Sequence, residues 1–210
     1  MMRLLIAVPT LDYVHSEFMK SLIGLTIRLK NDGVRFDVEI ISGTLVYSAR
    51  EKLAKKAVNE EYSHVLWLDS DMVFTDDLVE DLMFSEQSFV SGIYHTRRPP
   101  HNSCIFKDIS LDNIQRYDKG DYPSNTFEIA GCGFGCVLLE TQILKDVFAQ
   151  FDTCFLPMPS LGEDIAFCKR VSAIGVKMYC EPGVRLGHIG HITIYPEAYE
   201  QWKANNNIEV

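Results

Sequence analysis

Paired cysteines, long apolar runs and an excess of positive charge are all missing from this chain of 210 residues. Its six cysteines include no C-x-x-C pair, which argues against a zinc site and favours reduced thiols. The formal net charge of −9 argues against a nucleic acid polymer as partner, because such binding depends on clustered Lys and Arg. A single nucleotide is still compatible with an acidic chain if a cation lies between the two.

No stretch of the sequence predicts a transmembrane segment or a secretion signal. The first apolar run, Leu4 to Val8, ends at Pro9 and is too short for either. Together with the unpaired thiols, this predicts a cytoplasmic protein. The sequence also has no internal repeat, linker or low-complexity tract, so we expect a single domain over residues 1–210.

Apolar runs and helical periodicities alternate along the chain. In the first half we expect strands at 4–8, 34–42, 65–68 and 89–94. We also expect three helices, with Ser16 and Thr75 as N-caps of the first and third and Ser48 at the start of the second. In the second half we expect strands at 103–106, 126–130, 136–139 and 176–180, and helices at 141–150 and 162–173. Such alternation is typical of an α/β fold with a mostly parallel sheet and helices on both faces.

The most informative motif is Asp69-Ser70-Asp71, directly after the apolar strand at 65–68. Side chains alternate faces in extended backbone, so both carboxylates point the same way at the carboxyl end of a strand, where α/β sheets bind ligands. Such a pair suits magnesium, manganese or calcium, whose remaining positions are filled by water and phosphate oxygens. The implied substrate carries a diphosphate. Acidic turn residues that bond their own backbone give the same pattern, so the rest of the chain must decide.

A second acidic pair, Glu163 and Asp164, is expected at the first turn of a helix. The helix dipole favours carboxylates there, so the pair is also typical of an ordinary helix start. His188 and His191 follow in a glycine-rich loop. A lone histidine is usually structural, but two in a loop whose backbone can approach a ligand suit metal binding or proton transfer.

Taken in order, these motifs resemble the family 2 glycosyltransferases and their small phage and bacterial relatives. The resemblance extends from Leu4 to about His191 and is carried by Ser-Ala-Arg50, Asp69-Ser-Asp71, Gly-Glu163-Asp164-Ile, Gly175-Val-Lys-Met-Tyr, Pro182 and His188. It implies the GT-A fold: a Rossmann-like, mostly parallel sheet with helices on both faces and a small antiparallel acceptor-side portion. Residues 1–94 would form the nucleotide-binding half and residues 95–195 the acceptor-side half.

The resemblance also implies which residues meet the donor nucleotide. These are Pro9, Thr10, Arg50, Asp69, Ser70 and Asp71. Pro9 and Thr10 belong to the loop after the first strand, and Arg50 matches the arginine of an Ala-Arg-Asn motif. Glu51 replaces the usual Asn of that motif.

Metal and acceptor roles follow from the same resemblance. Asp71 would ligate Mn²⁺ or Mg²⁺, with Asp69 beside it on the nucleotide side. His188, or His191 in its place, would complete the coordination. Glu163 and Asp164 would face the acceptor, with Asp164 as the general base of an inverting reaction or a substrate-positioning group of a retaining one.

We therefore expect a metal-dependent glycosyltransferase that uses a nucleoside-diphosphate sugar, with a UDP-sugar favoured and the acceptor open. Acceptor contacts would come from loops 95–125 and 151–162 or from a second subunit of a homo-oligomer. The alternatives are a sugar-phosphate nucleotidyltransferase and a catalytically silent nucleotide-sugar-binding module. The loop after the first strand lacks the glycines and basic residues that nucleotidyltransferases usually carry there.

Two further segments have open interpretations. His95, Arg97 and Arg98 form a basic island that suits phosphate or a base, or is simply a solvated loop. The glycines of Gly131-Cys-Gly-Phe-Gly135 would expose backbone to a donor sugar, although a β-bulge needs no ligand.

Overall fold

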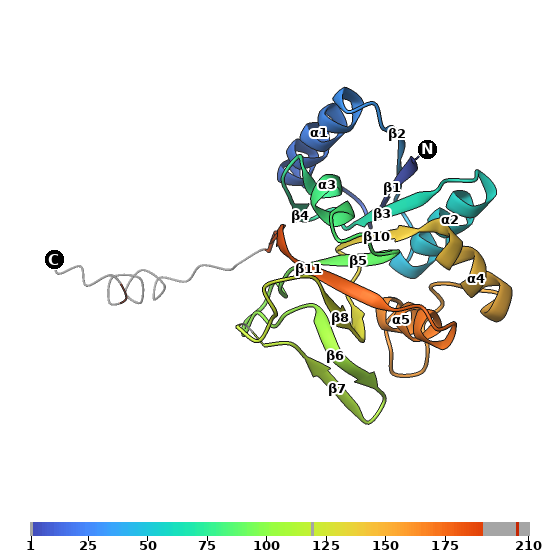
Figure 1. The fold of residues 1–210 in the computed structure, drawn as a ribbon, viewed down its shortest axis with the longest axis vertical. Helices are drawn as coiled ribbons and strands as arrows, with labels where there is room; N and C mark the ends of the chain where they lie inside the picture. Colours follow the sequence, from blue (N-terminus) through green and yellow to red (C-terminus); the bar gives the residue numbers. More distant parts are fainter. Residues whose placement is uncertain (1, 119, 191–204, 206–210) are drawn as a thin grey trace.

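A computed structural model of the chain describes residues 2–118, 120–190 and 205, and its centre is a large mixed sheet (Figure 1). The strands of this sheet are β1 Arg3–Pro9, β2 Arg35–Ile41, β3 His64–Leu68, β5 Phe89–Ile93, β8 Phe127–Ile129, β10 Cys136–Glu140 and β11 Met178–Arg185. They lie in the order β2-β1-β3-β10-β5-β11-β8. β2, β1 and β3 run parallel to one another, as do β5 and β11, whereas β10 and β8 run against their neighbours. The expected mostly parallel sheet is confirmed.

Helices cover both faces of this sheet (Figure 1). They are α1 Ser16–Asn31, α2 Val46–Asn59, α3 Leu78–Met83, α4 Thr141–Phe151 and α5 Glu163–Ala173. α1 and α3 pack on the face of β1 that carries Leu4, Ile6 and Val8, while α2, α4 and α5 pack on the face that carries Leu5 and Ala7. Every residue from Leu4 to Val8 is fully buried, as an apolar run in a central strand predicts. Among the described residues, no helix combines the length and apolar character needed to cross a membrane.

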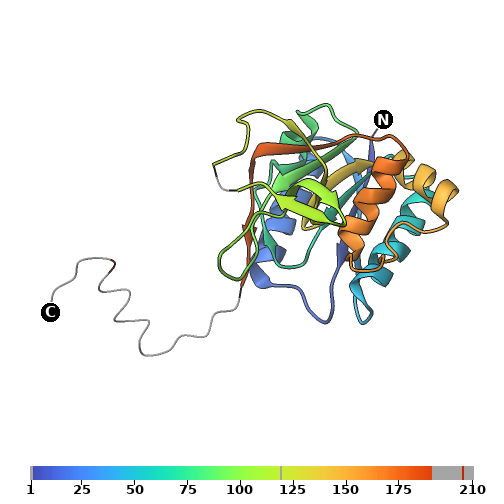
Figure 2. The ribbon, with the colours of Figure 1, turned by 90° about the horizontal axis from the view of Figure 1, so that it is seen from below.

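Two small antiparallel sheets complete the fold. The first consists of β6 Ile105–Ser110, β7 Asn113–Arg116 and β9 Gly131–Cys132, and its β6–β7 hairpin lies at the end of the molecule away from α1 (Figures 1 and 2). The second pairs β4 Met72–Val73 with β12 Gly187–His188. This short pairing places the segment after Asp71 beside His188, although the two are far apart in the sequence.

Several element boundaries differ from the sequence-based expectations. Ser16 is the first residue of α1 and not its cap, α2 begins at Val46 instead of Ser48, and α3 begins at Leu78 instead of Thr75. Within the described residues, the N-caps of these three helices make no side-chain hydrogen bond. Capping side chains therefore do not set the starts, which explains why a cap-based expectation missed them.

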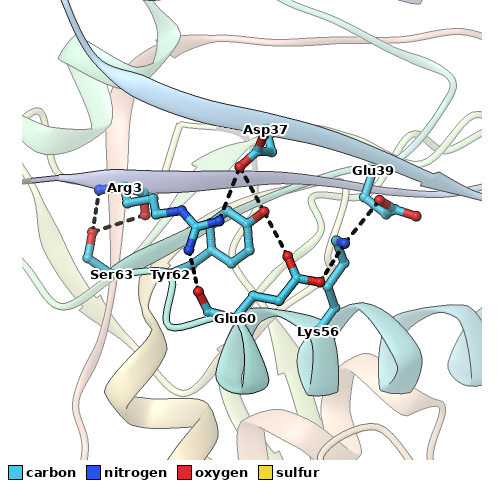
Figure 3. Close-up of polar contacts among 7 residues, drawn as sticks. All are labelled: Arg3, Asp37, Glu39, Lys56, Glu60, Tyr62 and Ser63. Atoms are coloured by element: carbon cyan, nitrogen blue, oxygen red, sulfur yellow. Dashed lines mark hydrogen bonds and ion pairs between the residues drawn. The ribbon is translucent and has the colours of Figure 1, made fainter.

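A polar network ties β1, β2 and α2 together at the amino-terminal end of the parallel strands. It consists of Arg3, Asp37, Glu39, Lys56, Glu60, Tyr62 and Ser63 (Figure 3). The Tyr62 hydroxyl donates to Asp37 Oδ2 at 2.8 Å, and the Arg3 guanidinium lies 4.1 Å from the centre of the Tyr62 ring. Burial, followed by the bond to Asp37, raises the pKa of Tyr62 to about 12. This network lies at the end of the strands opposite to the candidate site, so we assign it to stability.

Candidate functional site

A cavity of about 450 Å³ opens at the carboxyl ends of β1 and β3. It gathers the residues that the resemblance assigned to donor, metal and acceptor, except His191, which lies outside the described residues. The residues brought together are Pro9, Thr10, Arg50, Asp69, Ser70, Asp71, Glu163, Asp164 and His188. Arg97 of the basic island also lines it, whereas His95, Arg98 and the glycines at 131, 133 and 135 are not in its lining. Segments that are distant in the sequence therefore share one solvent-accessible space at the edge where α/β sheets bind ligands.

The loop after β1 forms one wall of the cavity. The Thr10 amide donates to the Ile41 carbonyl at 2.9 Å, and the Thr10 hydroxyl donates to the Tyr13 carbonyl at 2.6 Å. The Ser70 hydroxyl donates to Thr10 Oγ1 at 3.1 Å, which links this loop to the acidic turn after β3. These bonds fix a compact loop beside Asp69 and Asp71.

Arg50 on α2 is the buried cation of the site. Its side chain is 3% exposed, and its Nη2 donates to Asp69 Oδ1 at 2.9 Å while its Nε lies 3.7 Å from Glu163 Oε1. Burial lowers the pKa of Arg50, but the carboxylates of Asp69, Asp164 and Glu163 outweigh it and raise the pKa overall. Nε and Nη1 of Arg50 have no hydrogen-bond partner within the described part of the chain. Such donors are costly to bury unpaired, and the neighbouring carboxylates of Asp69 and Glu163 offset part of that cost by their charge.

Carboxylates are crowded around that guanidinium. Burial raises the pKa of Asp69 to about 6, against the opposing effect of Arg50. Burial, and then the neighbouring Asp164, raise the pKa of Glu163. Carboxylates in the lining of the cavity outnumber guanidinium groups, so the site holds excess negative charge at neutral pH, which suits a cation.

Asp71 has a different environment, because each of its carboxylate oxygens faces a different basic side chain. Oδ2 accepts from Arg97 Nη1 at 2.7 Å, and Oδ1 lies 3.6 Å from His188 Nε2. Burial raises the pKa of Asp71, but His188 and Arg97 outweigh it and lower the pKa. Of the two acidic residues in the triplet, Asp71 is thus the one that stays ionised most readily.

His188 is held with one ring nitrogen directed toward Asp71. Its Nδ1 lies 2.7 Å from the His95 carbonyl oxygen, and because a carbonyl only accepts, Nδ1 carries the proton. In the neutral ring the lone pair of Nε2 then faces Asp71. Burial lowers the pKa of His188, but the nearby Asp71 carboxylate and the hydrogen bond to the His95 carbonyl outweigh it and raise the pKa. A positive charge between Nε2 and Asp71, either a proton or a metal ion, is therefore favourable.

Comparisons with known proteins agree on the fold. No family model and no curated protein matches the chain. Among solved structures, A197 from STIV is 20% identical, with a TM-score of 0.60 over 91% of this chain and 87% of that chain. The catalytic domain of Drosophila beta1,4galactosyltransferase 7, in complex with xylobiose, is 15% identical, with a TM-score of 0.55 over 97% of this chain and 80% of that chain. GalNAc-T7, solved with UDP, GalNAc and Mn²⁺, is 11% identical, with a TM-score of 0.51 over 91% of this chain and 44% of that chain.

The chain has the GT-A fold. This is the fold class that the sequence resemblance implied. At identities of 20% or less the likeness concerns the fold alone, so the chemistry must be argued from the residues of this chain.

A divalent cation fits the Asp71–His188 side of the GT-A cavity. One ion with bonds of about 2.1 Å can contact both side chains across the 3.6 Å gap between Oδ1 and Nε2. Among the described residues, however, no group of three or more His, Cys, Asp or Glu side chains is arranged to hold a metal. The arrangement thus suits an ion that takes two ligands from the protein and the rest from phosphate oxygens and water.

Tyr94, which follows β5, is a site residue that the sequence analysis missed. Its hydroxyl accepts from the Gly135 amide at 3.0 Å, and its ring meets the His188 ring edge-to-face at 5.3 Å. A Cβ atom on Gly133 would lie 2.3 Å from the Tyr94 hydroxyl, and one on Gly135 would lie 2.7 Å from the Tyr94 ring. These two glycines therefore make room for Tyr94, which corrects their interpretation as backbone exposed to a sugar. No sequence signal at Tyr94 distinguishes it from the end of an ordinary buried strand.

The acidic pair at the start of α5 is supported by a loop that Glu51 and Arg170 hold in place. Glu51 Oε2 accepts the amides of Cys154 and Phe155 at 3.1 and 2.8 Å. Arg170 donates to the carbonyls of Cys154 and Leu156 at 2.8 and 2.7 Å. Glu51, noted in the sequence only as a departure from a motif, thus positions the segment that leads into Glu163 and Asp164.

Proposed function

We propose that this protein is a metal-dependent glycosyltransferase that takes a sugar from a nucleoside-diphosphate sugar, with a UDP-sugar as the favoured donor. The observation that carries the proposal is a single GT-A cavity in which Asp71 and His188 face each other beside Arg50, with Glu163 and Asp164 also in its lining. A galactosyltransferase 7 variant and GalNAc-T7, both similar in fold, were solved with manganese and a uridine nucleotide or nucleotide sugar. That likeness supports a uridine donor over the alternatives.

The roles proposed for the donor-side residues follow from the negative charge of the leaving diphosphate. When the sugar leaves, negative charge accumulates on the diphosphate, and a bound Mn²⁺ or Mg²⁺ would stabilise it as a Lewis acid. In our proposal Asp71 and His188 hold that ion. In the same proposal Arg50 and Asp69 bind the nucleotide together with Pro9, Thr10 and Ser70, which line the same cavity.

The acceptor side is assigned to the start of α5. Asp164 takes the proton from the acceptor hydroxyl if the reaction inverts the anomeric carbon, and positions the acceptor if it retains it. Glu163, 3.7 Å from Arg50, connects this side to the donor side. A carboxylate in this role typically contributes about 10²- to 10⁴-fold to the rate.

Donor binding is tested by thermal shift with UDP-, GDP-, CDP- and dTDP-linked sugars, with and without Mn²⁺. We expect a UDP-sugar to raise the melting temperature of the wild type only when Mn²⁺ is present, and this rise to disappear in Asp71→Ala. Asp112→Ala, which removes an exposed carboxylate from a turn, is the matched control and should behave as wild type. No response of the wild type to any donor would sink the proposal.

Transfer is tested with Asp164→Asn. Because Asp164 is assigned to the acceptor, this variant should keep the Mn²⁺-dependent shift with the donor while slow hydrolysis or transfer of that donor falls by about 10²-fold or more. The readout is release of UDP followed over time. Loss of the thermal shift instead would show that Asp164 belongs to the donor side.

A further inference from the structure

Arg97 occupies the oxygen of Asp71 that points away from His188. The contact is short, 2.7 Å between Nη1 and Oδ2, yet the two partners differ in exposure: the Arg97 side chain is 49% exposed and that of Asp71 is 14% exposed. His188, by contrast, is half-buried and bonded to the His95 carbonyl. Asp71 therefore has one fixed neighbour and one neighbour that solvent can easily displace.

The base of the Arg97 side chain is packed while its end is in the open. Arg97 Cβ and Cγ and its carbonyl lie so close to Gly190 that a Cβ atom there would meet them at 3.3 to 3.6 Å. Arg97 lines both the first cavity and an adjoining one of about 480 Å³ that is also lined by Tyr94, Thr96, Arg98, Cys104 and His188. A fixed base and an exposed end allow the guanidinium to move without any change in the backbone.

The guanidinium and a divalent cation compete for the same carboxylate. A cation bound between Asp71 and His188 draws on the charge that now holds Arg97, and the like charges repel each other at this distance. A diphosphate that enters with the cation offers oxygens to which a guanidinium binds in bidentate fashion. The cation removes one partner of Arg97, and the diphosphate supplies another.

We propose that Arg97 neutralises Asp71 through Oδ2 before cation and nucleotide bind, and moves to the donor diphosphate when a cation binds between Oδ1 and His188. This inference rests on the proposed function and adds a residue to it. Arg97 lowers the affinity for the free ion and raises the affinity for the ion together with a diphosphate. The site thereby binds the cation and the diphosphate together more favourably than it binds either one alone, which is a coupling between two ligands.

The test is a pair of titrations on Arg97→Gln. The first measures Mn²⁺ alone by the electron paramagnetic resonance signal of the free ion, and the second measures UDP by calorimetry at saturating Mn²⁺. For the variant we expect Mn²⁺ to bind about 3-fold or more tightly than to wild type, and UDP to bind about 10-fold or more weakly, as for a lost charge-assisted contact. A higher affinity for Mn²⁺ together with a lower affinity for UDP is the result expected if Arg97 moves from Asp71 to the diphosphate.

Two comparisons make the result specific. Arg35→Gln removes the same charge from an exposed position on β2 and should change neither affinity. In Arg97→Gln/Asp71→Asn the gain in Mn²⁺ affinity should vanish, because the gain acts through Asp71.

The failures of the two proposals are distinguishable. If wild type binds UDP with Mn²⁺ but Arg97→Gln leaves both affinities unchanged or weakens both, this inference is overturned and the proposed function stands. If wild type binds no UDP in the presence of Mn²⁺, the proposed function fails and the inference fails with it.

Discussion

At the scale of single residues, Asp69 is a carboxylate kept in the site at a cost to stability. Burial raises its pKa to about 6, whereas an unfolded Asp has a pKa near 3.9. A pKa raised on folding means that the protonated form is favoured in the folded state. The stabilising contribution is then fully present below about pH 4 and is lost as pH rises through about 6.

We therefore expect the free energy of unfolding of the ligand-free wild type to fall, relative to that of Asp69→Asn, between about pH 4 and pH 7. The difference should amount to roughly 1–2 kcal/mol, since one pKa unit corresponds to about 1.4 kcal/mol and the side chain keeps 29% of its exposure. Urea unfolding of both proteins across this pH range measures it. A difference that does not vary with pH would contradict the assignment.

The role of a single residue could be predicted from the sequence only where the residue belongs to a recognisable motif. Asp69 and Asp71 follow a buried strand, and the sequence alone places them at a binding edge. The sequence could not predict that the two aspartates have different basic partners, because those partners are distant in the chain. Asp69 contacts Arg50 of α2, whereas Asp71 lies beside Arg97 and His188.

At the scale of elements, the loop between α4 and α5 depends on buried charge for its shape. Glu51 on α2 and Arg170 on α5 satisfy four backbone groups of Cys154, Phe155 and Leu156. Burial lowers the pKa of Arg170, which reflects its removal from water. These bonds fix the direction in which the chain enters α5, and with it the place of Asp164.

For Glu51→Gln we expect a loss of about 1–2 kcal/mol in the free energy of unfolding, because a neutral amide replaces a charged acceptor of two buried amides. The Mn²⁺-dependent binding of UDP should change little, while UDP release in the transfer assay should fall. Urea unfolding, calorimetry and that assay read the three effects separately. Glu86→Gln, at an exposed turn, is the control and should stay within about 0.5 kcal/mol of wild type. A weakened UDP affinity with an unchanged rate would reverse the assignment.

Elements with a strong local pattern were predicted well, and those made by distant pairing were not. The apolar runs that became β1, β3 and β10 are recognisable by composition, since their residues are buried from end to end or nearly so. The two-residue strands β4, β9 and β12 have no periodicity to read, because each is formed only by its partner. Yet β4 and β12 are the pair that brings the turn after Asp71 to His188.

At the scale of the whole molecule, polar chemistry is divided between the two ends of the parallel strands. The network of Arg3, Asp37 and Tyr62 closes one end with its groups mutually satisfied (Figure 3). At the other end, two Arg50 nitrogens have no hydrogen bond to any described residue, and carboxylates are crowded together. Stability and binding are thus assigned to opposite ends of one sheet, and a chain-wide α/β pattern predicts this polarity while the individual partners depend on the fold.

The position of β10 sets the order in which the chain can assemble. β10 lies between β3 and β5, and in the described structure β5 pairs only with β10 and β11. Until residue 140 has emerged from the ribosome, one edge of β3 is unpaired and β5 has no neighbouring strand. The Asp69–Asp71 turn then follows a strand that is paired on one side only. The proposed nucleotide site is therefore completed late in synthesis, although most of its expected residues are translated early.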